Sequence, residues 1–212
     1  NMSGQTVMEL EHVFVQEIFP TSFGIHKCDR RKRGIPVSNY FNLGFFAQDK
    51  NGTVPVGNLA DWGNILAQSA DNPSWVNLYN KQLTTLYVKM DGQFGITKTN
   101  RLTTIDNLKT AVSGIPILQS GTPVNMETIK SEGYFGNELY DTWHGFLGLR
   151  GDSIVYVGAK CDFGQMPWIL LSLGIRDAIK VDGGGSFVLV NNGVELVGTT
   201  ENRRINNIGM WE

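Results

Sequence analysis

Long apolar runs, cysteine and histidine are scarce in this chain of 212 residues. No stretch approaches the roughly 18 consecutive apolar residues of a membrane-spanning helix, so we expect no membrane as a partner. The N-terminus lacks the basic segment and apolar core of a secretory signal peptide. If Met2 is the native start, we expect a cytoplasmic protein. Otherwise we expect a protein that is secreted or part of a phage particle.

Metal and cofactor motifs are also missing. The three histidines have no metal-ligand spacing, and the pair His26 and Cys28 supplies only two ligands, which do not make a zinc site. The two cysteines, Cys28 and Cys161, are too few for a disulfide framework, and we expect two free thiols. The sequence has no P-loop, no Rossmann fingerprint and no Gly-x-Ser-x-Gly elbow. We therefore expect no metal and no cofactor.

Excess charge of one sign is absent as well, because 18 Lys and Arg face 20 Asp and Glu, for a formal net charge of −2. This balance argues against a nucleic acid polymer as partner. One local basic run, His26 to Gly34, is interpreted as a solvated loop. The alternative is a rim that attracts a polyanionic substrate.

Glycine is abundant, with 25 residues against 7 prolines, and the apolar share of 41% is enough for one core. We expect a single domain over residues 1–212. Three turn sequences predict β-hairpins between strand-like runs. They are Asp49-Lys50-Asn51-Gly52, Asp91-Gly92 and Arg150-Gly151-Asp152.

Three segments favour helices: Thr103 to Val112, Asn125 to Ser131, and Asp162 to Leu173. The last is the clearest, because Asp162 and Gln165 have capping-box spacing and Gly174 follows as a C-cap. Short strands combined with a few helices predict an α+β fold with mixed or antiparallel sheets.

The run Val181-Asp182-Gly183-Gly184-Gly185-Ser186 carries most of the functional information. Three glycines between two apolar, strand-like segments indicate unusual backbone angles or a ligand that approaches the backbone closely. Successive N–H groups in such a turn can bind an anion, with the Asp182 carboxylate beside them. The alternative interpretation is a tight turn with a β-bulge.

Other pieces accompany this run in a fixed order along residues 39–211. They are Asn42-Leu43-Gly44-Phe45-Phe46, Pro55-Val56-Gly57, Leu173-Gly174 through Ala178, and Arg203-Arg204-Ile205-Asn206-Asn207. The phosphodiester glycosidase family has Asn-Gly-Gly-Phe-Phe, Pro-Val-Gly, a helix with Leu-Gly leading to Asp-Gly-Gly-Gly-Ser, and Arg-Pro-Val-x-Asn. The chain resembles that family through this ordered set.

The sequence departs from the family pattern at three positions. Leu43 stands in place of a glycine, and Phe187 in place of a second serine after the glycines. His144 stands where the family usually has an arginine that opens a strand. A protonated histidine could partly replace that cation. The change is equally consistent with a different ligand or with lost catalysis.

The resemblance implies hydrolysis of the bond between a sugar anomeric carbon and a phosphodiester. It makes Asp182 the candidate base or nucleophile, with Ser186 and His144 as further candidate catalytic residues. The candidate phosphate and substrate contacts are Asn42, Gly44, Gly183, Gly184, Gly185, Arg203 and Asn207. Asn42 and Asn207 would bind sugar hydroxyls or fix the loop. A phosphate leaving group needs little protonation, so one carboxylate could suffice where most glycosidases use two.

The partner expected from this resemblance is a small-molecule or glycan phosphodiester. A binding protein that sequesters a sugar phosphate or a nucleotide-like ligand is the alternative, favoured by His144 and Phe187. A structural component, for example of a phage particle, is a third hypothesis. Edge strands and aromatic residues such as Trp211 would allow a homo-oligomer.

Overall fold

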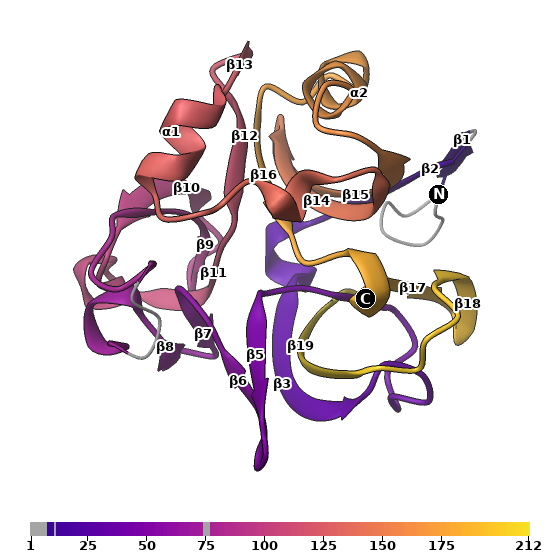
Figure 1. The fold of residues 1–212 in the computed structure, drawn as a ribbon, viewed down its shortest axis with the longest axis horizontal. Helices are drawn as coiled ribbons and strands as arrows, with labels where there is room; N and C mark the ends of the chain where they lie inside the picture. The colour runs from indigo at the N-terminus through magenta and orange to yellow at the C-terminus, as the bar shows by residue number, and fades with distance from the viewer. Residues whose placement is uncertain (1–7, 11, 74–76) are drawn as a thin grey trace.

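Antiparallel β-sheets dominate the computed structural model, which describes residues 8–10, 12–73 and 77–212 (Figure 1). There are three larger sheets and one two-stranded ribbon. The ribbon pairs β5 (Phe46–Asp49) with β6 (Gly52–Pro55). In the described part of the chain, no helix is long and apolar enough to span a membrane.

The seven-stranded sheet has the order β1-β2-β15-β14-β16-β12-β13. Its strands are β1 (Met8–Leu10), β2 (Val13–Ile18), β12 (Ile115–Gln119), β13 (Thr122–Pro123), β14 (Thr142–Arg150), β15 (Ser153–Cys161) and β16 (Asp177–Val181). The long hairpin of β14 and β15 lies at its centre, and its turn is the predicted Arg150-Gly151-Asp152.

Two five-stranded sheets complete the fold (Figure 1). One has the order β10-β9-β11-β7-β8 and the other the order β18-β17-β4-β19-β3. The first contains β7 (Leu59–Asp61), β8 (Asn64–Ala67), β9 (Leu83–Lys89), β10 (Phe94–Thr99) and β11 (Leu108–Ser113). The second contains β3 (Gly24–Arg31), β4 (Tyr40–Asn42), β17 (Val188–Asn191), β18 (Val194–Gly198) and β19 (Arg204–Met210).

Two short α-helices pack at the top of the view in Figure 1, α1 (Met126–Ser131) and α2 (Met166–Ser172). The Asn125 side chain caps α1 by accepting a hydrogen bond from the Thr128 N–H. Asp162 and Gln165 exchange the predicted capping-box bonds, but α2 itself begins only at Met166. Single 3₁₀ turns are η1 (Pro20–Ser22), η2 (Ser69–Asp71), η3 (Leu102–Thr104), η4 (Asn137–Leu139) and η5 (Gly184–Ser186).

The α+β prediction is therefore wrong, because the fold is β-rich. Every strand pairing among the described residues is antiparallel, and their two α-helices span only six and seven residues. The three predicted hairpins are confirmed. The helix predicted over 103–112 is wrong, since β11 fills its second half and pairs with β9 and β7. Long-range sheet pairing there outweighs the local pattern.

The basic run was also misjudged. Most of it, up to Arg31, forms β3, and Lys32 is completely buried instead of lying in a solvated loop. Cys28 and Cys161 are free thiols, as predicted.

The core lies on both faces of the seven-stranded sheet. Phe146 and Ala178 face one cluster together with Met166 of α2. Leu147 and Ile179 face a second cluster that includes Phe187, the residue directly before β17 of the neighbouring sheet. The connection from β16 to β17 crosses between these two sheets, and this crossing contains the glycine-rich run.

Candidate active site

The glycine-rich run leaves the seven-stranded sheet at the end of β16 and enters the neighbouring sheet at β17. Directly after β16, the Asp182 N–H donates to the Leu43 carbonyl oxygen at 2.8 Å. Gly184, Gly185 and Ser186 then form the 3₁₀ turn η5. The run is thus anchored to both sheets, and the chain after β4 lies against it.

Two of the glycines are required by geometry. A Cβ atom on Gly183 would lie 2.5 Å from the backbone oxygen of Trp143, which cannot move away easily. Gly184 has φ +61°, in the left-handed region that favours glycine. The run is therefore more than a flexible link. Among the described residues, no acceptor binds the N–H of Gly184 or of Gly185.

The Asp182 carboxylate is held in a fixed orientation. Its Oδ2 accepts from Asn42 Nδ2 at 3.1 Å, and its Oδ1 accepts from the Gly183 N–H at 2.9 Å. Burial raises the pKa of Asp182, while Lys180, both hydrogen bonds and Arg203 oppose that rise. The carboxylate thus combines raised basicity with positive charge nearby.

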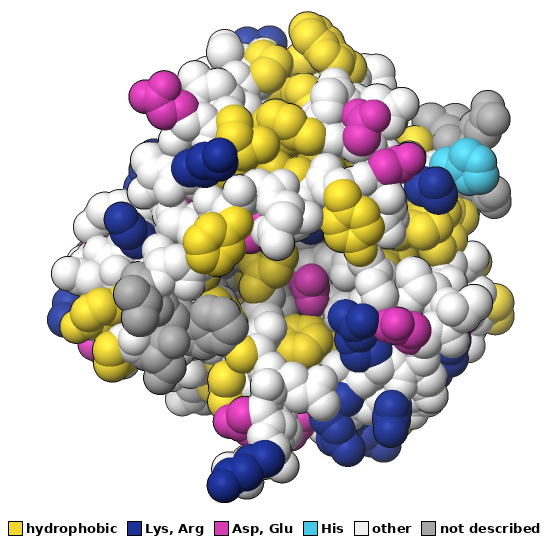
Figure 2. Space-filling model, in the orientation of Figure 1, with side chains coloured by type: hydrophobic (Ala, Val, Ile, Leu, Met, Phe, Trp, Pro, Cys, Tyr) yellow, Lys and Arg dark blue, Asp and Glu magenta, His cyan; other side chains and the backbone are white. Residues whose placement is uncertain are grey.

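Asp182 lies in a pocket of about 210 Å³. Figure 2 shows a hollow near the middle of this face, with acidic and basic side chains around it. The lining residues are Phe45, Glu138, Tyr140, Lys180, Asp182, Gly183, Gly184, Gly185 and Arg203. Five predicted site residues therefore meet at one pocket: Asp182, the three glycines and Arg203.

Lys180 was not predicted, although it lies two positions before Asp182 on a strand. Its side chain is only 2% exposed, and its Nζ donates to the Val181 carbonyl oxygen at 2.8 Å. Burial lowers the pKa of Lys180 to about 8, while Asp182, Glu138 and Cys161 act in the opposite direction. The period of two along a strand could have revealed it, because residues 180 and 182 share one face.

His144 lies next to this pocket but is not the cation that the family pattern would need. Its Nε2 lies 2.7 Å from the Tyr140 carbonyl oxygen, which can only accept, so Nε2 carries the proton. Its buried Nδ1 has no partner among the described residues. Burial and the charge of Lys180 lower the pKa of His144 to about 3. The ring is therefore neutral near pH 7, which opposes the predicted role of a protonated His144.

Arg203 lies at the rim of the pocket and is largely exposed. Its guanidinium contacts the Glu201 carboxylate at 2.6 Å, which offsets part of its charge. Ser186 is 3% exposed and does not belong to the pocket lining. Of these two predicted contacts, only Arg203 has direct access to a ligand in the pocket.

The remaining predicted residues lie outside the pocket lining and support it through hydrogen bonds. Asn207 is fully buried, accepts from the Gly44 N–H at 2.6 Å and donates to the Gly44 carbonyl oxygen at 3.4 Å. A Cβ on Gly44 would meet the Asn207 oxygen at 3.0 Å. Asn42 is buried as well and orients Asp182. Of the two roles expected for Asn42 and Asn207, these contacts favour fixing the loop.

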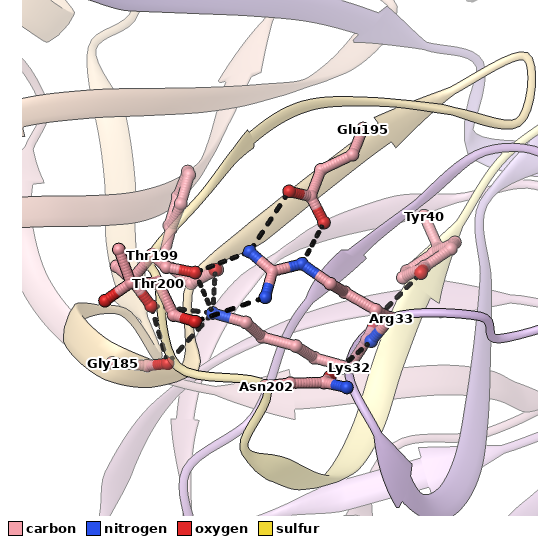
Figure 3. Close-up of polar contacts among 9 residues, drawn as sticks. Lys32, Arg33, Tyr40, Gly185, Glu195, Thr199, Thr200 and Asn202 are labelled. Carbon is pink, nitrogen blue, oxygen red and sulfur yellow. Dashed lines mark hydrogen bonds and ion pairs between the residues drawn. The ribbon is translucent and has the colours of Figure 1, made fainter.

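Lys32 donates hydrogen bonds to the end of the glycine-rich run (Figure 3). Its Nζ donates to the carbonyl oxygens of Gly185 and Phe187, each at 3.1 Å, and to Thr199 Oγ1 at 2.6 Å. Thr199 Oγ1 also donates to the Gly185 oxygen at 2.9 Å. Sequence reasoning missed this role because these partners lie more than 150 residues away from Lys32.

A search of protein-family models finds no match for this sequence, and a search of curated proteins finds none either. Solved structures do match. The catalytic domain of zebrafish N-acetylglucosamine-1-phosphodiester α-N-acetylglucosaminidase, described as auto-inhibited by its pro-peptide, superposes with a TM-score of 0.74. The identity is 14%, over 97% of this chain and 80% of that chain. The chain shares that fold.

Two further structures have a similar fold. An exported protein of Burkholderia pseudomallei K96243 matches with a TM-score of 0.64 and 10% identity, over 94% of this chain and 73% of that one. A Synechocystis protein matches with a TM-score of 0.62 and 14% identity. The match covers 97% of this chain but 61% of the Synechocystis chain. At these identities the likeness establishes the fold alone.

Proposed function

We propose that this chain is a hydrolase that cleaves the bond between a sugar anomeric carbon and a phosphodiester. The observation that carries the proposal is the Asp182 carboxylate, oriented by Asn42 and placed in a pocket with the glycine run. The fold similarity to a phosphodiester glycosidase domain supports the same reaction class. It also agrees with the ordered motifs of the sequence.

Asp182 acts as the base or the nucleophile at the anomeric carbon. Most glycosidases need a second carboxyl group as acid, but here the leaving group is a phosphomonoester, a weak base that departs without full protonation. The other carboxylate in the pocket lining, Glu138, already accepts from the N–H groups of Gly136 and Phe135. These hydrogen bonds give Glu138 a structural role, which agrees with a reaction in which Asp182 is the one reacting carboxylate.

The substrate extends beyond the pocket. About 210 Å³ is below the roughly 300–1,000 Å³ of sites that enclose a drug-sized ligand. This space takes a phosphodiester group and part of one sugar ring, with the rest of the substrate over the rim. Capped glycans, teichoic-acid-like wall polymers and molecules with a ribose–phosphate link all have this chemistry.

Hydrolysis of a panel of sugar-1-phosphodiesters tests the proposal. Wild type is expected to release sugar and phosphomonoester, whereas Asp182→Asn retains the fold and loses at least about 100-fold in rate. Asp152→Asn is the matched control, because Asp152 is exposed in a hairpin turn. An Asp182→Asn variant as active as wild type would exclude the assigned role.

A binding protein without turnover is the second candidate. Two observations favour it: His144 is neutral where the family pattern has a permanent cation, and Arg203 is paired with Glu201. Such a protein would retain a sugar phosphate or nucleotide-like ligand unchanged. Native mass spectrometry after incubation with the panel distinguishes the two, since a hydrolase releases products and a sequestering protein keeps intact ligand.

A further inference from the structure

We propose that Lys180 is the residue that binds the anionic oxygen of the ligand, supplying from β16 the positive charge that His144 does not supply from β14. This inference rests on the proposed function and names the phosphate-binding residue of the same pocket. It assigns a role to a side chain that no motif of the sequence marked. It also accounts for the departure at His144.

The strand register places the two residues together. Phe146 of β14 lies directly opposite Lys180 of β16. Side chains of opposite residues share a sheet face, and His144 precedes Phe146 by two positions, so all three lie on the same face. The influence of the Lys180 charge on the His144 ring is consistent with this proximity. The site thus retains a cation on this face, one strand away from the position of the family arginine.

Lys180 also has unused hydrogen-bonding capacity. An ammonium group carries three donors, and the Nζ of this nearly fully buried side chain makes one hydrogen bond, to the Val181 carbonyl oxygen. Among the described residues, no carboxylate lies within 4.0 Å of it as an ion pair. Its Nζ also lies 5.2 Å from the centroid of the Phe45 ring.

A buried cation with unused donors is costly unless a partner arrives. Because Lys180 lines the pocket, a ligand oxygen can be that partner. Gly184 and Gly185 belong to the same lining, and their N–H groups lack acceptors among the described residues. Together these donors match an anionic phosphate oxygen.

The charged residues of the pocket lining also favour Lys180 as the group that binds an anion. Its lining contains two cations, Lys180 and Arg203, and two carboxylates, Glu138 and Asp182. Arg203 is already paired with Glu201, so Lys180 is the cation left to meet an anion. Without Lys180 the two lining carboxylates would repel a phosphodiester.

The test is calorimetric titration of dimethyl phosphate and of inorganic phosphate into four proteins at pH 7. Wild type is expected to bind saturably, and Lys180→Met to bind about 10- to 100-fold more weakly, as for loss of a charged hydrogen bond. Lys180→Arg keeps a cation and retains most of the affinity. Lys27→Met is the matched control, since Lys27 is an exposed lysine outside the pocket lining, and its loss leaves affinity within about threefold.

A second measurement follows Lys180 itself in wild type, and Lys180→Arg serves only to assign its resonance. The ¹⁵N-ammonium resonance of Lys180 in wild type, identified by its absence in Lys180→Arg, is expected to shift as dimethyl phosphate is added. Equal affinity of Lys180→Met and wild type overturns the proposal. So does an ammonium signal that does not move, or a wild type that binds neither probe.

The experiments test the role of Lys180 and the hydrolase assignment independently of each other. Phosphate binding that depends on Lys180, without turnover of any panel member, rejects the hydrolase and supports the role of Lys180. Turnover that is unchanged in KM and kcat in Lys180→Met rejects the role of Lys180 and supports the hydrolase. Asp182→Asn should abolish turnover while it still binds dimethyl phosphate, which confirms that the two residues have different tasks.

Discussion

The Lys32 ammonium donates a hydrogen bond to the Gly185 carbonyl oxygen at 3.1 Å, from 153 residues away in the sequence. Lys32 is fully buried, and its other acceptors are the Phe187 and Thr199 oxygens. One side chain just after β3 therefore ties Gly185 and Phe187 to Thr199, the residue that follows β18. The shape of the pocket wall depends on this contact.

Lys32→Met is expected to lower the free energy of unfolding by about 2 kcal/mol, because three backbone carbonyl oxygens lose a charged donor. It should also weaken dimethyl phosphate binding by releasing the Gly185 segment. Urea unfolding and calorimetry measure the two effects. Lys27→Met is the matched control, since Lys27 is an exposed lysine in β3, the strand that ends directly before Lys32. Equal stability of both variants would contradict this assignment.

Gly184→Ala is expected to cost about 1 kcal/mol for its positive φ, and it displaces the Tyr140 hydroxyl of the pocket lining, which would otherwise lie 2.8 Å from the new Cβ. Gly193 is the matched control, with φ +78° and open space around its Cβ position. Both alanine variants should lose stability through φ, whereas only Gly184→Ala should also lose dimethyl phosphate affinity. Equal losses of affinity would show that Gly184 does not contribute to the pocket.

The contribution of Lys180 to the free energy of unfolding and the affinity of the pocket for phosphate are expected to change in opposite directions as pH rises from 8 to 10. Burial lowers the pKa of Lys180 to about 8 against the opposing charges of Asp182, Glu138 and Cys161, whereas an unfolded lysine titrates near about 10.4. Between these values the unfolded chain holds more protons, so the contribution of Lys180 to stability rises with pH. Over the same range the lysine loses its charge, and phosphate affinity falls.

The comparison of wild type with Lys180→Met isolates this effect. Burial raises the pKa of the Cys161 thiol to about 12, which acts on stability with the opposite sign in alkaline solution. Both proteins share that thiol, so the difference between their urea-unfolding curves at pH 7, 8.5 and 9.5 reports Lys180 alone. A difference independent of pH would contradict the lowered pKa.

Transferring the positive charge from position 180 on β16 to position 144 on β14 is expected to show that the two positions are energetically coupled. His144→Arg alone adds a second buried cation beside Lys180 and should destabilise the protein by several kcal/mol. Lys180→Gln alone should weaken phosphate binding. The double variant, His144→Arg with Lys180→Gln, should recover stability and part of the affinity. A double-mutant cycle measures this, and strictly additive effects would argue against a shared charge site.

Local sequence signals were sufficient for the hairpins. Asn51-Gly52, Asp91-Gly92 and Gly151-Asp152 all lie where two paired strands connect, because the conformation of a short turn depends mainly on the residues within it. The N-cap of α1 at Asn125 is equally local. The 103–112 segment was mistaken for a helix because pairing of β11 with β9 and β7 depends on residues distant in sequence.

The sequence by itself determined the turns, the free cysteines, the glycine-rich run and Asp182 as its carboxylate. Each depends on residue type and on neighbours a few positions away. Only the tertiary structure decided that Lys180 and His144 share one face of the sheet, that the buried Lys32 donates a hydrogen bond to Gly185, and that Asn207 binds Gly44. Burial and strand pairing set which of these groups carry charge, and both arise when distant segments pack together.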